Sequence, residues 1–224
     1  MLARISILSS LLPITFFLLF CFKNGNRELW VIFLYSISSL LFDLFLFISP
    51  WAFENKYLVW NTFAILEYSM ISYFFYRIIN SRSTRIFILI SFFVYLLLFC
   101  LLASTSDDHF NSVLSAVGSV IILTLCLIFF VHSMKLTAEP VSFFSPIFLI
   151  VIALLVYVSS TLFLYIVASR LSDKEMEQYW IINHIVNILM NLIFSIAFIS
   201  FHFQRKNPSP ENASVDFTRF PDDR

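Results

Sequence analysis

Glycine and charged residues are scarce in this chain. Two glycines occur in 224 residues, against 29 phenylalanines, and this composition excludes both a disordered chain and a turn-rich β-protein. Charged residues make up 12% of the chain, whereas an ordinary soluble domain has about 25%. The 14 basic residues are matched by 14 acidic ones, so the chain has no basic excess to attract nucleic acid. We therefore expect no nucleic-acid partner.

Cysteine is also rare, and its spacing is uninformative. Cys21, Cys100 and Cys126 all lie in apolar runs, without a CxxC motif or a histidine close by in sequence. Such cysteines are typical of small core or lipid-facing positions rather than of a metal site or a disulfide. We expect neither a metal ion nor a cofactor.

Long apolar runs dominate what is present. Hydrophobic residues make up 60% of the chain, and the mean hydropathy is +0.89. A membrane-spanning helix needs roughly 20 apolar residues, and seven runs come close to or exceed that length: 5–22, 29–49, 57–76, 86–104, 111–133, 143–168 and 179–203. The sequence predicts an all-α polytopic membrane protein, a seven-transmembrane-helix bundle over residues 1–203. Because the connectors are short, consecutive helices should pack as antiparallel neighbours.

The distribution of lysine and arginine predicts the orientation. Ten of these residues fall on one side of the predicted spans and four on the other, the four being Arg4, Lys56, Arg170 and Lys174. This asymmetry places the N-terminus outside and the C-terminus in the cytoplasm. The first run has no small-residue cleavage site, so we expect a retained helix rather than a signal peptide. Residues 204–224 are polar and contain proline, which predicts a disordered cytoplasmic tail.

One carboxylate, Glu67, lies near the middle of the third run. A charge at that depth costs about 2.5–3.5 kcal/mol on insertion scales, and intramembrane carboxylates usually have a function. No lysine or arginine lies inside any predicted span. Glu67 is therefore expected either to be protonated and donating a hydrogen bond, or to be ionised and paired with His184.

Polar residues recur at helical spacing in several runs. In the last run they form one stripe, which could be either packing contacts between helices or the lining of a cavity: His184, Asn187, Asn191, Ser195 and His202. Ser36, Ser39 and Asp43 share a face of the second run, and Tyr157, Thr161 and Tyr165 share a face of the sixth. In the third run, Asn61 and Tyr68 lie on a different face from Glu67.

Several of these groups occur at similar depth. At about 1.5 Å per residue, Asp43 lies roughly 9 Å, Glu67 roughly 15 Å and His184 roughly 8 Å below the outer boundary. We therefore predict a polar pocket that opens to the extracytoplasmic side. Its candidate ligand-binding residues are Glu67, His184, Asn187, Asn191, Asp43, Asn61, Thr161 and Tyr157.

Two well-known classes of membrane protein are disfavoured. A retinal protein needs a lysine inside the bundle, and all five lysines lie at or beyond boundaries. A metal hydrolase usually shows HxxxH or HExxH spacing, which is missing. We expect a sensor, ligand-binding or accessory membrane module first, and an intramembrane lipid-modifying hydrolase second, with Asp43, Glu67 and His184 as its catalytic candidates. A small transporter or proton-coupled channel comes third, because no pair of proline- or glycine-broken helices is predicted.

Two resemblances accompany these patterns. The segment Ser39-Leu-Leu-Phe-Asp43 resembles the Ser-x-x-Gly-Asp segment of the lysoplasmalogenase family of small membrane proteins, with Phe42 in place of the glycine. Over residues 25–203 the chain looks like an uncharacterised family of small seven-helix integral membrane proteins of Bacteroidota-type bacteria. The features that carry this second resemblance are Asn61 with Glu67-Tyr68, Ser145-Pro146, Tyr157-Val-Ser-Ser160, and Trp180-Ile-Ile-Asn-His184-Ile-Val-Asn187 followed by Asn191 and Ser195. It implies a multi-pass protein of the bacterial inner membrane. Because a membrane module must pass its signal to other proteins, we expect a membrane or cytoplasmic protein as a partner, in addition to membrane lipids.

Overall fold

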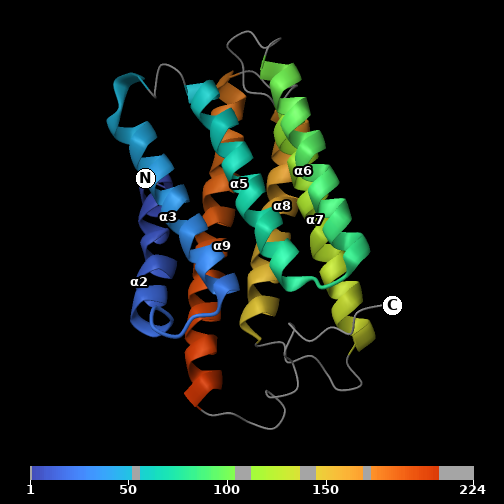
Figure 1. Ribbon diagram of the computed structural model, residues 1–224. Helices are drawn as coiled ribbons and strands as arrows, with labels where there is room; N and C mark the ends of the chain where they lie inside the picture. Colours follow the sequence, from blue (N-terminus) through green and yellow to red (C-terminus); the bar gives the residue numbers. More distant parts are fainter. Residues whose placement is uncertain (1, 52–55, 104–111, 137–144, 169–172, 207–224) are drawn as a thin grey trace.

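The computed structural model describes residues 2–51, 56–103, 112–136, 145–168 and 173–206, and all its regular elements there are α-helices (Figure 1). They are α1 (Leu2–Ser9), α2 (Leu11–Phe20), α3 (Arg27–Ile48), α5 (Lys56–Ile78), α6 (Arg82–Ala103), α7 (Ser112–Leu136), α8 (Pro146–Ala168) and α9 (Asp173–Lys206). The all-α prediction is confirmed. The predicted disordered tail falls, apart from its first residues, outside the described residues.

Proline divides the first predicted span. Pro13 has no N–H to donate to the carbonyl of Ser9, and its ring crowds that carbonyl. The chain makes a turn at Ser10 between α1 and α2, so the span predicted over 5–22 consists of two helical segments. The Ser9 hydroxyl donates to the carbonyl oxygen of Ser6 at 2.6 Å, which satisfies a polar group next to the break. Together the two helices still provide 19 residues of apolar length.

Helix ends extend beyond the apolar runs. Helix α6 begins at Arg82 rather than at 86, and the backbone N–H of Thr84 points to the Ser81 hydroxyl at 3.5 Å, as at an N-cap. Helix α9 covers Asp173–Lys206, whereas hydropathy predicted 179–203. Its added first turns are rich in Asp and Glu, which the helix dipole favours at that end. Hydropathy alone misses such polar turns.

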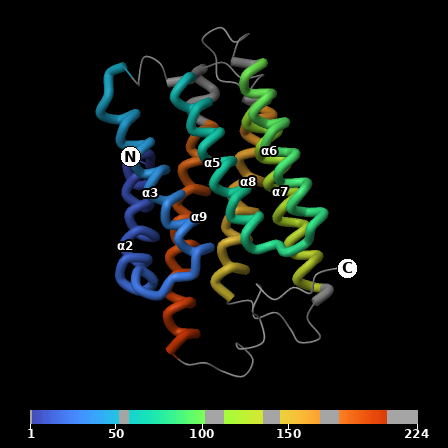
Figure 2. Tube along the Cα trace, viewed as in Figure 1, coloured from blue at the N-terminus to red at the C-terminus, as the bar shows by residue number. Residues whose placement is uncertain are grey.

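The helices form a closed ring around a buried interior. Around the ring, α2 contacts α3, α3 contacts α5, α5 contacts α7, α7 contacts α8, α8 contacts α9, and α9 returns to α1 and α2. Helix α6 packs outside the ring against α5 and α7. Figure 2 shows the N-terminal segment running beside the last helix. Consecutive helices are in contact, as their short connectors predicted.

The outer surface of the bundle is apolar. Large hydrophobic side chains such as Ile48, Phe93 and Ile166 are more than half exposed, which suits contact with lipid chains rather than with water. Six helical segments are long and apolar enough to cross a membrane. Helix α5 is not among them, although it lies in contact with α3, α6 and α7. The protein is therefore an all-α polytopic membrane bundle, and α5 is a more polar helix that forms part of the ring.

One end of the bundle is held by an ion pair and by aromatic packing. An Arg77 Nη atom lies 3.2 Å from Glu28 Oε1, the one ion pair among the described residues, and joins the end of α5 to the start of α3. Nearby, the ring of Phe17 stacks on Phe33 at 4.3 Å and meets Phe198 edge-on at 5.2 Å. These contacts bring α2, α3 and α9 together.

The three cysteines are all free. Cys21 and Cys126 are buried, and Cys100 is exposed on the apolar surface. This agrees with the predicted core or lipid-facing positions.

Candidate ligand-binding site

Glu67 lies on the inner face of α5, where two tyrosines contact it. The Tyr35 hydroxyl on α3 donates to Glu67 Oε1 at 2.8 Å, and the Tyr157 hydroxyl on α8 is a second hydrogen-bond partner. Tyr35 is 2% exposed, so the pair is shielded from lipid. Hydrogen bonds from two hydroxyl groups replace part of the hydration that a carboxyl group loses in the bundle. One carboxyl group thus links three helices.

Of the two alternatives for Glu67, the ion pair with His184 is not observed. The described part of the chain contains a single ion pair, Arg77–Glu28, so His184 is not within ion-pair distance of the carboxyl group. His184 is not among the residues that line the two cavities described below. The tyrosine hydroxyls occupy the place that the prediction assigned to histidine.

A cavity of about 110 Å³ lies beside Glu67 and is called the larger cavity here. Its polar lining is drawn from α3, α5, α7, α8 and α9: Tyr35, Ser39, Asp43, Glu67, Ser115, Tyr157, Tyr165, Asn183 and Asn187. Since a cavity needs only about 10–15 Å³ to hold one water, and each water in the liquid occupies about 30 Å³, the cavity has room for several waters or for one small molecule. Both intramembrane carboxylates, Asp43 and Glu67, line it, as the depth argument predicted.

Aromatic rings form the rest of the wall. Trp60 of α5 and Trp180 of α9 stack at a centroid distance of 5.3 Å, and Phe42 of α3 stacks on Phe63 of α5 at 4.1 Å. All four rings line the larger cavity. The Trp60–Trp180 stack connects helices that are distant in sequence, whereas the Phe42–Phe63 stack connects the successive helices α3 and α5.

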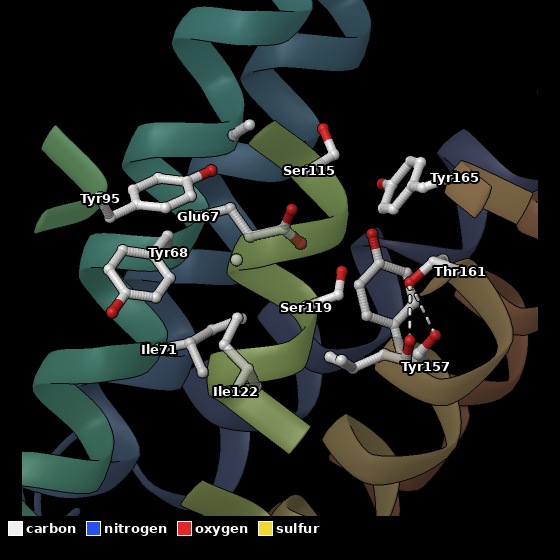
Figure 3. Close-up of a pocket in the computed structure, with 13 residues that line it drawn as sticks. Glu67, Tyr68, Ile71, Tyr95, Ser115, Ser119, Ile122, Tyr157, Thr161 and Tyr165 are labelled. Carbon is white, nitrogen blue, oxygen red and sulfur yellow. Dashed lines mark hydrogen bonds between the residues drawn. The ribbon is translucent and has the colours of Figure 1, made fainter. Parts of the chain in front are cut away.

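A smaller cavity of about 30 Å³ continues from the same carboxyl group. Figure 3 shows Glu67 extending from α5 toward Tyr157, Thr161 and Tyr165 of α8, with Ser115 and Ser119 of α7 alongside. Glu67, Tyr157 and Tyr165 line both cavities. The smaller cavity has room for about one water.

Gly118 brings a further tyrosine close to this site. A Cβ atom at Gly118 would lie 3.0 Å from the Tyr95 ring, so the glycine leaves room for that ring against α7. Tyr95 is 2% exposed and packs on Tyr68 at a centroid distance of 4.2 Å. The Tyr68 hydroxyl donates to Ser91 of α6 at 2.9 Å. The second polar face of α5 therefore points at α6, as its separation from Glu67 predicted.

The polar stripe on α9 serves mainly to hold helices together. Asn191 donates to Ser9 Oγ at 2.9 Å and to Ser10 Oγ at 3.2 Å, at the break between α1 and α2. Asn187 donates to Ser6 Oγ at 2.9 Å but also lines the larger cavity. Of the two readings left open, packing applies to Asn191, and both apply to Asn187. At the other end of the stripe, His202 also serves packing, because its ring centroid lies 4.9 Å from that of Phe20 on α2.

Of the remaining candidate ligand-binding residues, some line a cavity and others do not. Thr161 lines the smaller cavity, while its hydroxyl donates to the carbonyl of Tyr157 at 3.0 Å within its own helix. Asn61 and Asn191 are not among the residues lining either cavity. The structure therefore brings together Asp43, Glu67, Tyr157, Thr161 and Asn187 of the eight candidates.

Sequence reasoning missed several lining residues. Tyr35 precedes Ser39 and Asp43 at steps of four, so helical spacing could have included it. Ser115 and Ser119 are also four apart on α7, but serines in apolar helices commonly bond their own backbone and give a weak signal. The site is thus a polar cavity, rich in tyrosine and carboxyl groups, inside an apolar bundle. Such a cavity can hold a small polar molecule.

Comparison of the chain with protein-family models, with characterised proteins and with solved structures found no match.

Proposed function

We propose that the protein is a seven-helix protein of the bacterial inner membrane that binds a small ligand around Glu67 and acts as a sensor or accessory module. The observation that carries this proposal is the larger cavity, which has a volume of about 110 Å³ and is lined by polar side chains from five helices. Packing alone does not require such a space, because protein interiors are normally filled. The bacterial location follows the resemblance to the Bacteroidota-type family.

The ligand is proposed to enter from the extracytoplasmic side. Asp43, Trp60 and Trp180 lie near the end of α3 and the starts of α5 and α9, which meet at one end of the bundle (Figure 1). The excess of lysine and arginine lies toward the other end, which favours the cytoplasm for that end. In this orientation, seven spans require α5 to cross the membrane as a shielded polar helix.

Ligand binding can be converted into helix movement through Glu67. The carboxyl group joins α3 through Tyr35 and α8 through Tyr157. A ligand that takes over one of these hydrogen bonds changes how the two helices are held, and so biases one helix arrangement over another. A partner protein at the cytoplasmic loops would receive the signal.

The proposal is tested by native mass spectrometry of the purified full-length protein, in which a bound small molecule should be retained. Glu67→Gln and Asp43→Asn should lose that molecule. Glu28→Gln is the matched control, because it removes a carboxylate of the ion pair at the opposite end of the bundle. Loss of the molecule in the control alone, or an empty cavity in the wild type under all lipid conditions, would contradict the proposal.

An intramembrane lipid-modifying hydrolase is the second candidate. One observation favours it: Asp43 and Glu67 line the same cavity, as a general acid and a general base must. Turnover of a panel of phospholipids and plasmalogens, abolished in Asp43→Asn and Glu67→Gln but kept in Glu28→Gln, would move this function to first place.

A further inference from the structure

We propose that the ligand carries an organic ammonium group, held in the larger cavity between the carboxylates and the aromatic wall. This inference rests on the proposed function and names the class of its ligand. The same group occurs in free amines and in amine-bearing lipid headgroups, and both sources are considered below.

The charges around the larger cavity favour a cationic ligand. Asp43 and Glu67 line the larger cavity, and no lysine or arginine is among its lining residues. In the described part of the chain neither carboxylate forms an ion pair. Tyrosine hydroxyls stabilise a carboxylate by hydrogen bonds but do not neutralise it. A bound cation would offset the cost of ionised carboxyl groups at this depth, which an anionic or neutral ligand would not do.

Aromatic rings in the wall of the larger cavity favour an organic ammonium group. The stacked pair Trp60–Trp180, together with Tyr157 and Tyr165, lines the same cavity as the carboxylates. The face of an aromatic ring attracts cations, and cages of such rings are how proteins recognise quaternary ammonium groups. A metal ion fits the site less well than an organic cation. The described residues contain no group of three or more histidine, cysteine, aspartate or glutamate side chains placed to hold a metal ion.

The size of the larger cavity suits a small amine. Its volume of about 110 Å³ is enough for several waters, which is the scale of choline or ethanolamine. Asn183 and Asn187 line the cavity as well, and their amides suit the hydroxyl end of either molecule.

An apolar groove on the side of the bundle reaches Tyr165, which also lines the larger cavity. An apolar groove of about 410 Å³ between α7 and α8 is lined by Val113, Val117, Val120, Leu162 and Ile166, and also by Tyr165. Val120 is 49% exposed and Ile166 is 59% exposed, so the groove opens on the lipid-facing surface. Tyr165 also lines both cavities. A headgroup could therefore reach the carboxylates while its acyl chain stays in the groove.

The central test compares choline with its neutral isostere, in which a carbon atom replaces the nitrogen. Binding of both is measured by calorimetry and by tryptophan fluorescence on the full-length protein in lipid-free detergent, since Trp60 and Trp180 line the cavity. Choline should bind at least about tenfold more tightly than the isostere. Ethanolamine should bind as well. Equal binding of choline and isostere, or no binding of either amine, overturns the ammonium proposal.

Variants locate the site. Glu67→Gln and Trp180→Leu should each weaken choline binding by about tenfold or more. Tyr73→Phe is a control on the same helix, because Tyr73 is 53% exposed on the outer surface. Far-UV circular dichroism and size-exclusion profiles establish that each variant is folded. Should Glu67→Gln not fold, Trp180→Leu and Asp43→Asn carry the test. Choline affinity unchanged in every folded cavity variant would refute the location.

Two further measurements separate the sources of the ammonium group. If a lipid headgroup is the natural ligand, nanodiscs of phosphatidylethanolamine should block choline binding, and nanodiscs of phosphatidylglycerol should not. Val120→Trp, which fills the groove, should then restore choline binding in phosphatidylethanolamine. If a free amine is the ligand, both nanodiscs should allow the same binding. Block by phosphatidylglycerol alone contradicts an ammonium ligand.

Failure of this inference can be told apart from failure of the proposed function. A neutral or anionic molecule that copurifies with the wild type and is lost in Glu67→Gln would refute the ammonium class and keep the binding function. A protein that retains no molecule and binds no amine would remove both.

Discussion

Replacing Asn191 should weaken the bundle without affecting the ligand. Asn191 is 3% exposed, and its side-chain amide donates to the hydroxyls of Ser9 and Ser10 where α1 meets α2. We consider Asn191→Ala, Ser9→Ala and the double variant, which together form a double-mutant cycle.

The magnitude follows from the two hydrogen bonds. Side-chain hydrogen bonds between membrane helices contribute about 0.6 kcal/mol on average and at most about 1.7 kcal/mol. Ser9 keeps its hydrogen bond to the Ser6 carbonyl when Asn191 is removed, so its hydroxyl is not left unsatisfied. Asn191→Ala should therefore lower the free energy of unfolding by about 1–2 kcal/mol, including the lost packing of the amide. The coupling energy with Ser9 should be about 0.6 kcal/mol.

The assay is reversible unfolding in mixed detergent micelles with increasing sodium dodecyl sulfate, followed by far-UV circular dichroism. Retention of the bound molecule is measured in parallel by native mass spectrometry. A coupling energy near zero would refute the contact between Asn191 and Ser9. Loss of the bound molecule with unchanged stability would refute the assignment of Asn191 to packing and return it to the site.

Three further predictions concern other regions. Gly118→Ala should lower stability by about 1–3 kcal/mol, less the roughly 1 kcal/mol by which alanine favours a helix, because the new methyl group would lie 3.0 Å from the Tyr95 ring. Micelle unfolding measures this change, and when Gly118→Ala is made in a Tyr95→Leu background it should no longer be destabilising. Arg77→Met leaves the buried carboxylate of Glu28 unpaired and should cost about 1–2 kcal/mol, a value reduced by the 32% exposure of the arginine side chain, and adding Glu28→Gln should restore part of it in the same assay. Reporter fusions should show a cytoplasmic C-terminus, so a C-terminal fluorescent protein should glow and a C-terminal phosphatase should be inactive; the opposite pattern would invert the proposed orientation.

The sequence alone determined the architecture because hydropathy and helix length are local properties. In lipid, an apolar run of about 20 residues forms a helix, since a helix makes all the hydrogen bonds of its own backbone. The same reasoning placed Glu67 and Asp43 at a common depth, and the structure brings both to one cavity. Helix ends were less well predicted, because polar turns at the start of α9 and the N-cap at Ser81 do not register as hydrophobic.

Tertiary structure decided which of the polar groups at that depth meet. Spacing shows which residues share a face of one helix, but not which helix that face contacts. The ring order turns Tyr35 and Tyr157 toward Glu67, and turns Asn191 toward the serines at the break between α1 and α2. Pro13 makes that break, and the break sets where Ser9 and Ser10 lie. His184, equally plausible from depth, therefore has no ion pair with Glu67, because a partner is chosen by the position of neighbouring helices and not by distance along the chain.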